Sequence, residues 1–145
     1  MMPATPRELI VIDNEAVQAL RSTAHPKHRT VMPYVRVVDS RRRRSPSNVV
    51  VVVPSTVRAE AGWDRTDPGW ALANRFRVVD RALDESLGNV AAAIRSRLGP
   101  SVSVVDAHVG AVVQSEQSAD VKVITSDPRD IAAVAERANV VIVTI

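Results

Sequence analysis

Four acidic residues stand at positions where a carboxylate can do chemistry. Asp13 and Asp127 follow short apolar runs, Glu60 comes soon after a run of five valines, and Asp106 lies among valines at helical spacing. A carboxylate among apolar side chains is costly to bury unless an arginine, a hydrogen-bond donor or a metal ion compensates it. The chain has no cysteine and only three histidines, so oxygen ligands and a hard cation are favoured over a zinc site.

Each acid also has a purely structural explanation. Asp13 and Asp127 could cap the helices that follow them, with Asp130 completing a capping box, and Glu60 could be a surface residue. Asp106 is the hardest to explain in this way, because valines share its helical face. Four acids at one end of a sheet would repel one another, and such an arrangement favours a bound cation.

The elements that must position these acids alternate along the chain. The periodicity predicts strands at 9–12, 49–53, 75–79, 121–125 and 140–145. It predicts helices at 14–22, from 26 or 30 to 43, at 54–61, 83–98 and 103–118, and from 128 to Asn139, with Ser55 capping the third and Gly62 ending it.

This alternation predicts an α/β fold with a doubly wound parallel five-stranded sheet, in the order 3-2-1-4-5, and helices on both faces. The five valines 49–53 indicate a strand buried on both faces, which is typical of a parallel sheet. In such folds ligands bind beyond the carboxyl ends of the strands, where the acids are expected. We expect residues 1–145 to form one domain.

Composition and charge narrow the class of protein. The chain has 145 residues, 46% of them apolar and 24% charged, which is typical of a globular domain and excludes a disordered chain. The apolar run at 9–12 is too short for a signal peptide or a membrane span, so we expect a cytoplasmic protein with no membrane partner. Motifs for a serine-hydrolase elbow, a dinucleotide cradle or a phosphate-binding loop are absent from the sequence.

The positive charge is concentrated in one segment. Residues 25–44 carry seven Lys or Arg against one acid. A polyanion lying across an acidic, cation-charged site would explain this segment, and so would a solvated helix end. The candidate contacts with a polyanion are Arg41, Arg42, Arg43 and Arg44.

Four segments together resemble a known family. They are LIVIDNEA (9–16), VVPSTVRAE (52–60), VDAHV (105–109) and VITSDPRDI (123–131). Their order and spacing resemble those of PIN-domain nucleases, most closely the VapC-type toxins of toxin-antitoxin modules. The resemblance covers nearly the whole chain.

This resemblance implies a metal-dependent endoribonuclease that hydrolyses RNA phosphodiester bonds with water activated by Mg²⁺ or Mn²⁺. The implied catalytic and metal-binding acids are Asp13, Glu60, Asp106 and Asp127. The implied supporting residues are Ser126, Asp130 and Asn14. Asn14 departs from the small residue usual after the first aspartate, but it can still orient water or cap a helix. We interpret His108 as a core or surface residue rather than a ligand.

The resemblance also implies a small antitoxin partner. We expect that partner to present an arginine to the acids and to dock an apolar helix in a groove around Val17, Leu20 and Val35. We also expect a homodimer that pairs through the mid-chain helices and the Trp63–Trp70 loop, because exposed tryptophans are costly in a monomer.

Two other classes of protein stay open at this point. One is a module of the same fold that binds or processes RNA without a toxin role or without catalysis. A module that only binds RNA would show no tight carboxylate-dependent Mn²⁺ site. The other is a phospho-acceptor receiver domain, which also gathers acids at strand ends. The receiver ranks lower, because no lysine follows Lys122.

Overall fold

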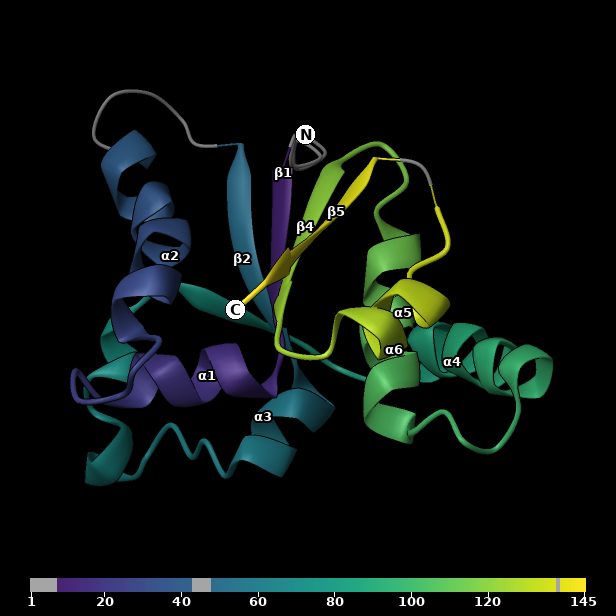
Figure 1. The fold of residues 1–145 in the computed structure, drawn as a ribbon, viewed down its shortest axis with the longest axis horizontal. Helices are drawn as coiled ribbons and strands as arrows, with labels where there is room; N and C mark the ends of the chain where they lie inside the picture. The colour runs from purple at the N-terminus through teal and green to yellow at the C-terminus, as the bar shows by residue number, and fades with distance from the viewer. Residues whose placement is uncertain (1–7, 43–47, 138) are drawn as a thin grey trace.

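One parallel sheet forms the centre of the computed structural model, which describes residues 8–42, 48–137 and 139–145 (Figure 1). Within these residues its strands are β1 (Glu8–Ile12), β2 (Val49–Pro54), β3 (Val78–Arg81), β4 (Asp120–Thr125) and β5 (Val140–Thr144). All neighbours pair in parallel, in the order β3-β2-β1-β4-β5. The sheet order and direction predicted from the sequence are confirmed.

Helices cover both faces of the sheet, as predicted. Those on one side are α1 (Asn14–Arg21) and α2 (His28–Arg42). Those on the other side are α4 (Glu85–Leu98), α5 (Val104–Ser115) and α6 (Pro128–Val134). The short helix α3 (Ser55–Ala61) follows β2 and packs against both α1 and α5. It therefore links the two helical layers at the carboxyl end of the sheet.

The central strands are buried on both faces. In β1, Leu9, Ile10, Val11 and Ile12 are each at most 1% exposed, although successive side chains point to opposite faces. The valines of β2 are buried except for Val50, which is half-buried. Burial on both faces explains why these strands are continuous apolar runs rather than alternating ones.

Several predicted boundaries are wrong, among them the end of the fifth helix, which is Ser115 rather than 118. The third strand runs over Val78–Arg81 rather than 75–79, because Ala73–Arg75 form a 3₁₀ turn (η2) that follows another at Pro68–Trp70 (η1). Ser55 does not cap α3, since the cap position is Pro54, which has no side chain able to bond.

The end of the last helix was also predicted wrongly. Helix α6 ends at Val134, whose carbonyl accepts a hydrogen bond from the Gln114 side chain, and not at Asn139. Three residues later, Arg137 donates to backbone carbonyls at the end of α5, including that of Val113. After Val134 the backbone is no longer helical, and Arg137 binds the end of α5 instead. The predicted end of α3 at Gly62 is confirmed, with a left-handed φ of 74°.

Helices α5 and α6 meet at a glycine. A Cβ atom on Gly110 would lie 2.6 Å from the carbonyl oxygen of Val134 and 3.0 Å from Cδ1 of Ile94. Neither the backbone of α6 nor the buried side chain of α4 has room for that atom. Gly110 therefore sets the distance between α5 and its two neighbours. In the part of the chain that the structure describes, no helix is long and apolar enough to cross a membrane.

Candidate functional site

Asp13 lies where β1 ends and α1 begins. Its side chain is only 8% exposed, and Oδ1 accepts a 2.8 Å hydrogen bond from the Asn14 backbone N–H. Oδ2 accepts a 2.9 Å hydrogen bond from the hydroxyl of Thr125. The pKa of Asp13 is raised, mainly because burial disfavours the charged form, and the charges of Glu60 and Asp127 raise it further. The hydrogen bonds from Asn14 and Thr125 oppose this rise.

Asp127 is held near Asp13 through the same hydroxyl. Thr125 is the last residue of β4 and is fully buried, and its Oγ1 accepts a 2.9 Å hydrogen bond from the Asp127 backbone N–H. Asp127 stands at the cap position of α6, but its side chain makes no capping hydrogen bond. The structural explanation of this carboxylate as a helix cap is therefore wrong, and its oxygens stay exposed at the sheet edge.

Glu60 is tied to the start of α1. It lies in the last turn of α3 and is exposed, and its Oε1 accepts a 2.9 Å hydrogen bond from the Asn14 side-chain amide. A second contact joins the same two helices, because the Gln18 side chain donates to the Ala61 carbonyl at 3.0 Å. Glu60 is thus held toward the acids rather than free on the surface.

Asp106 enters from the other helical layer. It lies in the first turn of α5, which Ser103 caps by accepting a 3.0 Å hydrogen bond from the Asp106 backbone N–H. The pKa of Asp106 is raised to about 6, chiefly by burial and then by the charges of Asp13, Asp130 and Asp127. Asp106 and Asp130 also share a cavity of about 270 Å³. Its other lining residues are Leu98, Ser101, Val102 and Ala133.

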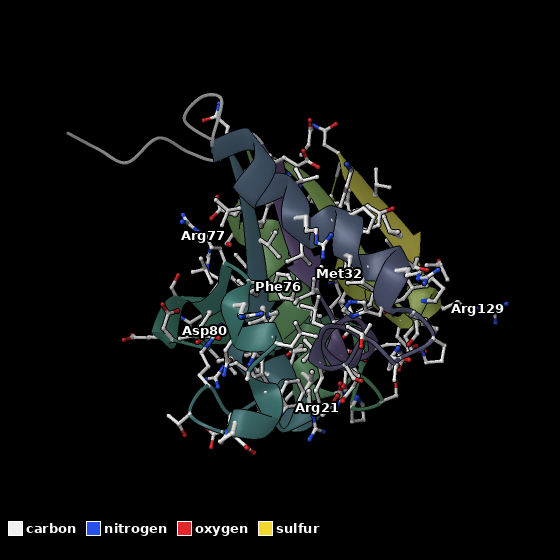
Figure 2. The ribbon with its side chains drawn as sticks, turned by 90° about the vertical axis from the view of Figure 1, so that its left-hand side faces the viewer. Arg21, Met32, Phe76, Arg77, Asp80 and Arg129 are labelled. Atoms are coloured by element: carbon white, nitrogen blue, oxygen red, sulfur yellow. The ribbon has the colours of Figure 1, made fainter. Side chains whose placement is uncertain are left out.

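The acids lie close enough to repel one another, and no cation of the described chain relieves Asp13 or Asp106. Every charged group that shifts the pKa of these two residues is another acid. The cation nearest in sequence, Arg129, is exposed and extends away from the protein (Figure 2). The site therefore carries uncompensated negative charge, which favours a bound cation.

The donor chemistry fits a hard cation, since carboxylate oxygens are its preferred ligands. Among the described residues, however, no three carboxylate or imidazole groups are placed so that they could hold one ion together. The predicted acids are thus electrostatically coupled without forming a closed coordination shell.

The hydroxyl that contacts the acids belongs to Thr125, which was not among the predicted site residues. Ser126 was expected to support the acids, but it is exposed, and its hydroxyl makes no hydrogen bond with the described residues. The neighbouring Thr125 makes that contact instead. A signal was present in the sequence, because Thr125 is the last residue of the apolar run that precedes Asp127. Among the four predicted RNA contacts, Arg43 and Arg44 lie outside the described residues, as do the side chains of Arg41 and Arg42.

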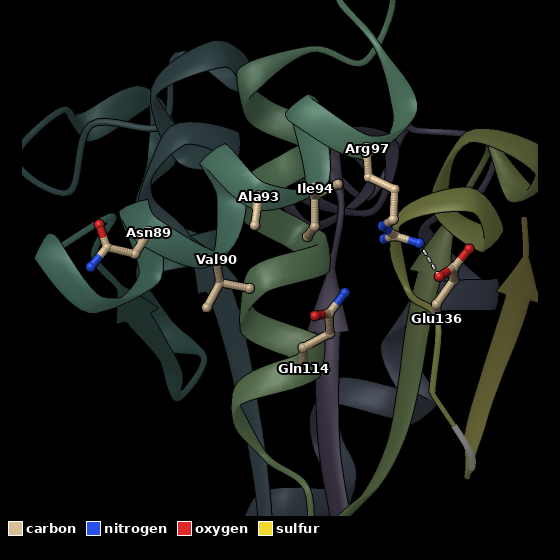
Figure 3. Close-up of a pocket in the computed structure, with 7 residues that line it drawn as sticks. All are labelled: Asn89, Val90, Ala93, Ile94, Arg97, Gln114 and Glu136. Atoms are coloured by element: carbon tan, nitrogen blue, oxygen red, sulfur yellow. Dashed lines mark hydrogen bonds and ion pairs between the residues drawn. The ribbon is translucent and has the colours of Figure 1, made fainter.

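A larger hollow of about 590 Å³ lies away from the acids (Figure 3). Val90, Ala93 and Ile94 of α4 line it, together with Gln114 of α5 and the ion pair between Arg97 and Glu136. Gln114 is in the last turn of α5, whereas Asp106 is in the first. The hollow is therefore separate from the candidate site.

The groove expected for a partner helix is not there. Val17 and Leu20 are fully buried and Val35 is 2% exposed, because α1 and α2 pack these side chains into the chain's own core. The expectation that these residues form a docking groove is wrong.

The dimer was expected because exposed tryptophans would need cover, but Trp63 and Trp70 are each only 2% exposed. Their rings stack with centroids 5.8 Å apart. Arg65 covers Trp63 and Arg21 covers Trp70, at 4.5 and 4.7 Å from the ring centroids. These tryptophans offer no exposed apolar surface that a second copy would need to cover.

Comparison with known proteins supports the fold alone. No protein-family model matches the chain, and no curated protein sequence matches it. Among solved structures, the chain is similar to one in the crystal structure of VapBC2 from Rickettsia felis bound to a DNA fragment from its promoter, with a TM-score of 0.58 and 10% identity. The match covers 94% of this chain and 98% of that one. The protein therefore has an α/β fold of the PIN/VapC type.

Proposed function

We propose that this protein is a Mg²⁺- or Mn²⁺-dependent endoribonuclease and the toxin of a toxin-antitoxin system, formed by a single domain over residues 1–145. The observation that carries the proposal is the uncompensated charge shared by Asp13, Asp106 and Asp127 at the carboxyl end of a PIN-like sheet. Capping does not explain Asp127, and no basic side chain explains Asp106. A cation with a bound phosphodiester would relieve both.

In this proposal Asp13 and Asp127 are direct metal ligands, because they follow β1 and β4 most closely. Asp106 and Glu60 complete the catalytic quartet, as ligands or through water. When bound at these acids, a divalent ion would supply an activated water molecule and would neutralise charge on the phosphodiester.

The protein's own side chains position this quartet. Thr125 fixes the Oδ2 atom of Asp13, and Asn14 turns the Glu60 carboxylate toward α1. Asp130 adds negative charge beside Asp106 and belongs to the supporting residues. Asp13 is buried and both of its carboxylate oxygens accept hydrogen bonds, so its orientation is fixed before substrate binds.

The experiment that tests the activity is cleavage of single-stranded RNA by the purified protein with Mg²⁺, Mn²⁺ or EDTA. We expect cleavage with either metal and none with EDTA, and loss of cleavage in Asp13→Asn. Metal-independent cleavage would contradict the assignment. RNA binding without cleavage by the folded protein would support the alternative, a PIN-fold module that binds RNA without catalytic activity.

The toxin role rests on the resemblance and on the VapBC2 neighbour. A small antitoxin would present an arginine to the acids, because a planar guanidinium can bridge two carboxylates. The coding frame next to this one is the place to look for it. Co-expression of its product should yield a complex that does not cleave RNA, and failure to co-purify would argue for an RNA-processing role.

A homodimer also stays a prediction, now without the tryptophan argument. Light scattering at micromolar concentration tests it, and a clean monomer of 15.7 kDa would refute it.

A further inference from the structure

A buried histidine joins the two helices that carry Glu60 and Asp106. His108 lies in α5, two residues after Asp106, and is fully buried. Its Nδ1 atom forms a 2.7 Å hydrogen bond with the hydroxyl of Thr56 in the first turn of α3. Burial lowers the pKa of His108, so at neutral pH the ring is a neutral hydrogen-bonding group and not a counter-charge for the acids.

The remaining nitrogen of His108 is not satisfied. Nε2 is buried and has no hydrogen-bond partner among the described residues, although the carbonyls of Arg81 and Ala82 come close enough to act on its pKa. A buried polar atom without a partner costs free energy of folding.

Thr56 and Glu60 stand one helical turn apart, so they share a face of α3. Helix α3 has seven residues, which is too short to hold its own orientation, and its contacts must do so. Asn14 and Gln18 hold its carboxyl end against α1. The Thr56–His108 hydrogen bond is the side-chain contact that ties its other end to α5.

We propose that the Thr56–His108 pair fixes α3 against α5 and thereby holds Glu60 near Asp13, where it can take part in binding the metal ion. Thr56 and His108 are positioning residues and touch neither metal nor RNA. This inference rests on the proposed nuclease function and adds two residues to it, neither of which the acidic motifs include.

The test is a pair of substitutions at Thr56. Thr56→Val keeps the shape and removes the hydroxyl, whereas Thr56→Ser keeps the hydroxyl. We expect Thr56→Val to weaken Mn²⁺ binding, measured by calorimetry on the metal-free protein, by about 10-fold or more, the usual cost of losing a group that orients a metal ligand. We expect kcat to fall with little change in the KM for RNA, and Thr56→Ser to restore both quantities. Thr56→Ala provides the same comparison if valine prevents folding.

A variant in the same helix controls for a general loss of stability. Val57 is fully buried in α3, and Val57→Ala opens a cavity without touching the hydrogen bond. We expect Val57→Ala to lower Tm while leaving Mn²⁺ affinity and kcat within about 2-fold, well short of the 10-fold loss expected for an orienting group. Equal losses of Mn²⁺ affinity in Val57→Ala and Thr56→Val would overturn the positioning role.

The outcomes separate the two proposals. If the wild type and Thr56→Val bind Mn²⁺ and cleave RNA equally well, the positioning role is overturned and the nuclease assignment stays intact. Wild-type protein that neither binds Mn²⁺ nor cleaves RNA would overturn the proposed function, and the positioning role with it.

Discussion

The hydroxyl of Thr125 donates a 2.9 Å hydrogen bond to Oδ2 of Asp13, across 112 positions of sequence and within the core. The Thr125 hydroxyl oxygen, Oγ1, in turn accepts a 2.9 Å hydrogen bond from the backbone N–H of Asp127. One buried hydroxyl thus joins the carboxyl ends of β1 and β4, the two adjacent strands that deliver acids to the site. Thr125 holds both acids while contributing no charge of its own.

Removing this hydroxyl should affect stability and activity together. Thr125→Val leaves a buried carboxylate oxygen without its donor, so we expect the free energy of unfolding to fall by about 1–3 kcal/mol. We also expect metal-dependent cleavage to fall, because Asp13 can then rotate. Urea unfolding and RNA cleavage measure the two effects. Thr125→Ser should keep most of both, and a fully active Thr125→Val would show that the bridge is not needed.

Asp106→Asn should separate activity from folding. The substitution removes one negative charge from the proposed metal site, so we expect RNA cleavage to fall by at least about 100-fold, more than for a residue that only supports a ligand. The circular dichroism spectrum should stay that of the wild type. A folded Asp106→Asn protein that cleaves RNA at the normal rate would remove Asp106 from the catalytic quartet.

The raised pKa of Asp106 predicts how stability depends on pH. Folding raises this pKa from 3.8 to about 6, so the folded state binds the proton more tightly than the unfolded state. The contribution of Asp106 is therefore most favourable below pH 4 and is lost as the pH rises toward 6.

In EDTA at pH 7.5, Asp106→Asn should thus be more stable than the wild type. We expect a gain of about 1 kcal/mol, well below the full value of such a shift, because the carboxylate is only half-buried. Thermal unfolding between pH 4 and 8 tests this. If the difference in stability between the wild type and Asp106→Asn does not change between pH 4 and 6, the electrostatic coupling among the acids is contradicted.

Two glycines in helices should respond to alanine in opposite ways. Gly110→Ala places a Cβ 2.6 Å from the Val134 carbonyl oxygen, so we expect a loss of about 1–3 kcal/mol from overpacking. Gly88 in α4 has nothing within 4 Å of the same atom, so Gly88→Ala should stabilise by up to about 1 kcal/mol. Urea unfolding of both variants tests the close approach of α5 and α6, which equal effects of the two substitutions would disprove.

The basic segment should contribute salt-dependent affinity for RNA. Replacing Arg41, Arg42, Arg43 and Arg44 by Gln should flatten the dependence of log affinity on log salt by about 0.7 for each arginine that contacts a phosphate. Binding is best measured on a catalytically silent protein, for example one with Asp106→Asn. An unchanged slope would mean that these arginines form only a solvated helix end.

The fold was largely predictable because the buried central strands require continuous apolar residues, which are visible in the sequence. Runs such as 9–12 and 49–53 are apolar on both faces, and this pattern fits a central parallel strand. The strand at Val78–Arg81 was misplaced because it is short and lies at the sheet edge, where its side chains are mostly exposed. The end of α6 was missed because the chain turns there toward contacts with a helix distant in sequence, such as the hydrogen bond that Val134 accepts from Gln114 of α5.

The site was predictable only in its acids. Acids that follow strands must gather at one edge of a parallel sheet, so Asp13 and Asp127 could be placed from sequence. The contacts of Thr125 with Asp13, and of Thr56 with His108, join residues far apart in the chain and obey no local pattern. The groove for a partner helix was predicted wrongly because the apolar side chains of α1 and α2 are buried in the chain's own core.

The stack of Arg65, Trp63, Trp70 and Arg21 gives the protein an optical reporter of its own. These are the only two tryptophans of the chain, and both belong to the segment between α3 and β3. Their rings are 5.8 Å apart and inclined by 19°, close enough for excitonic coupling in the circular dichroism spectrum. Intrinsic fluorescence therefore follows this one segment, whereas far-ultraviolet circular dichroism follows the sheet and helices. Comparing the two signals during unfolding reveals whether the segment beside Glu60 opens before the rest of the domain does.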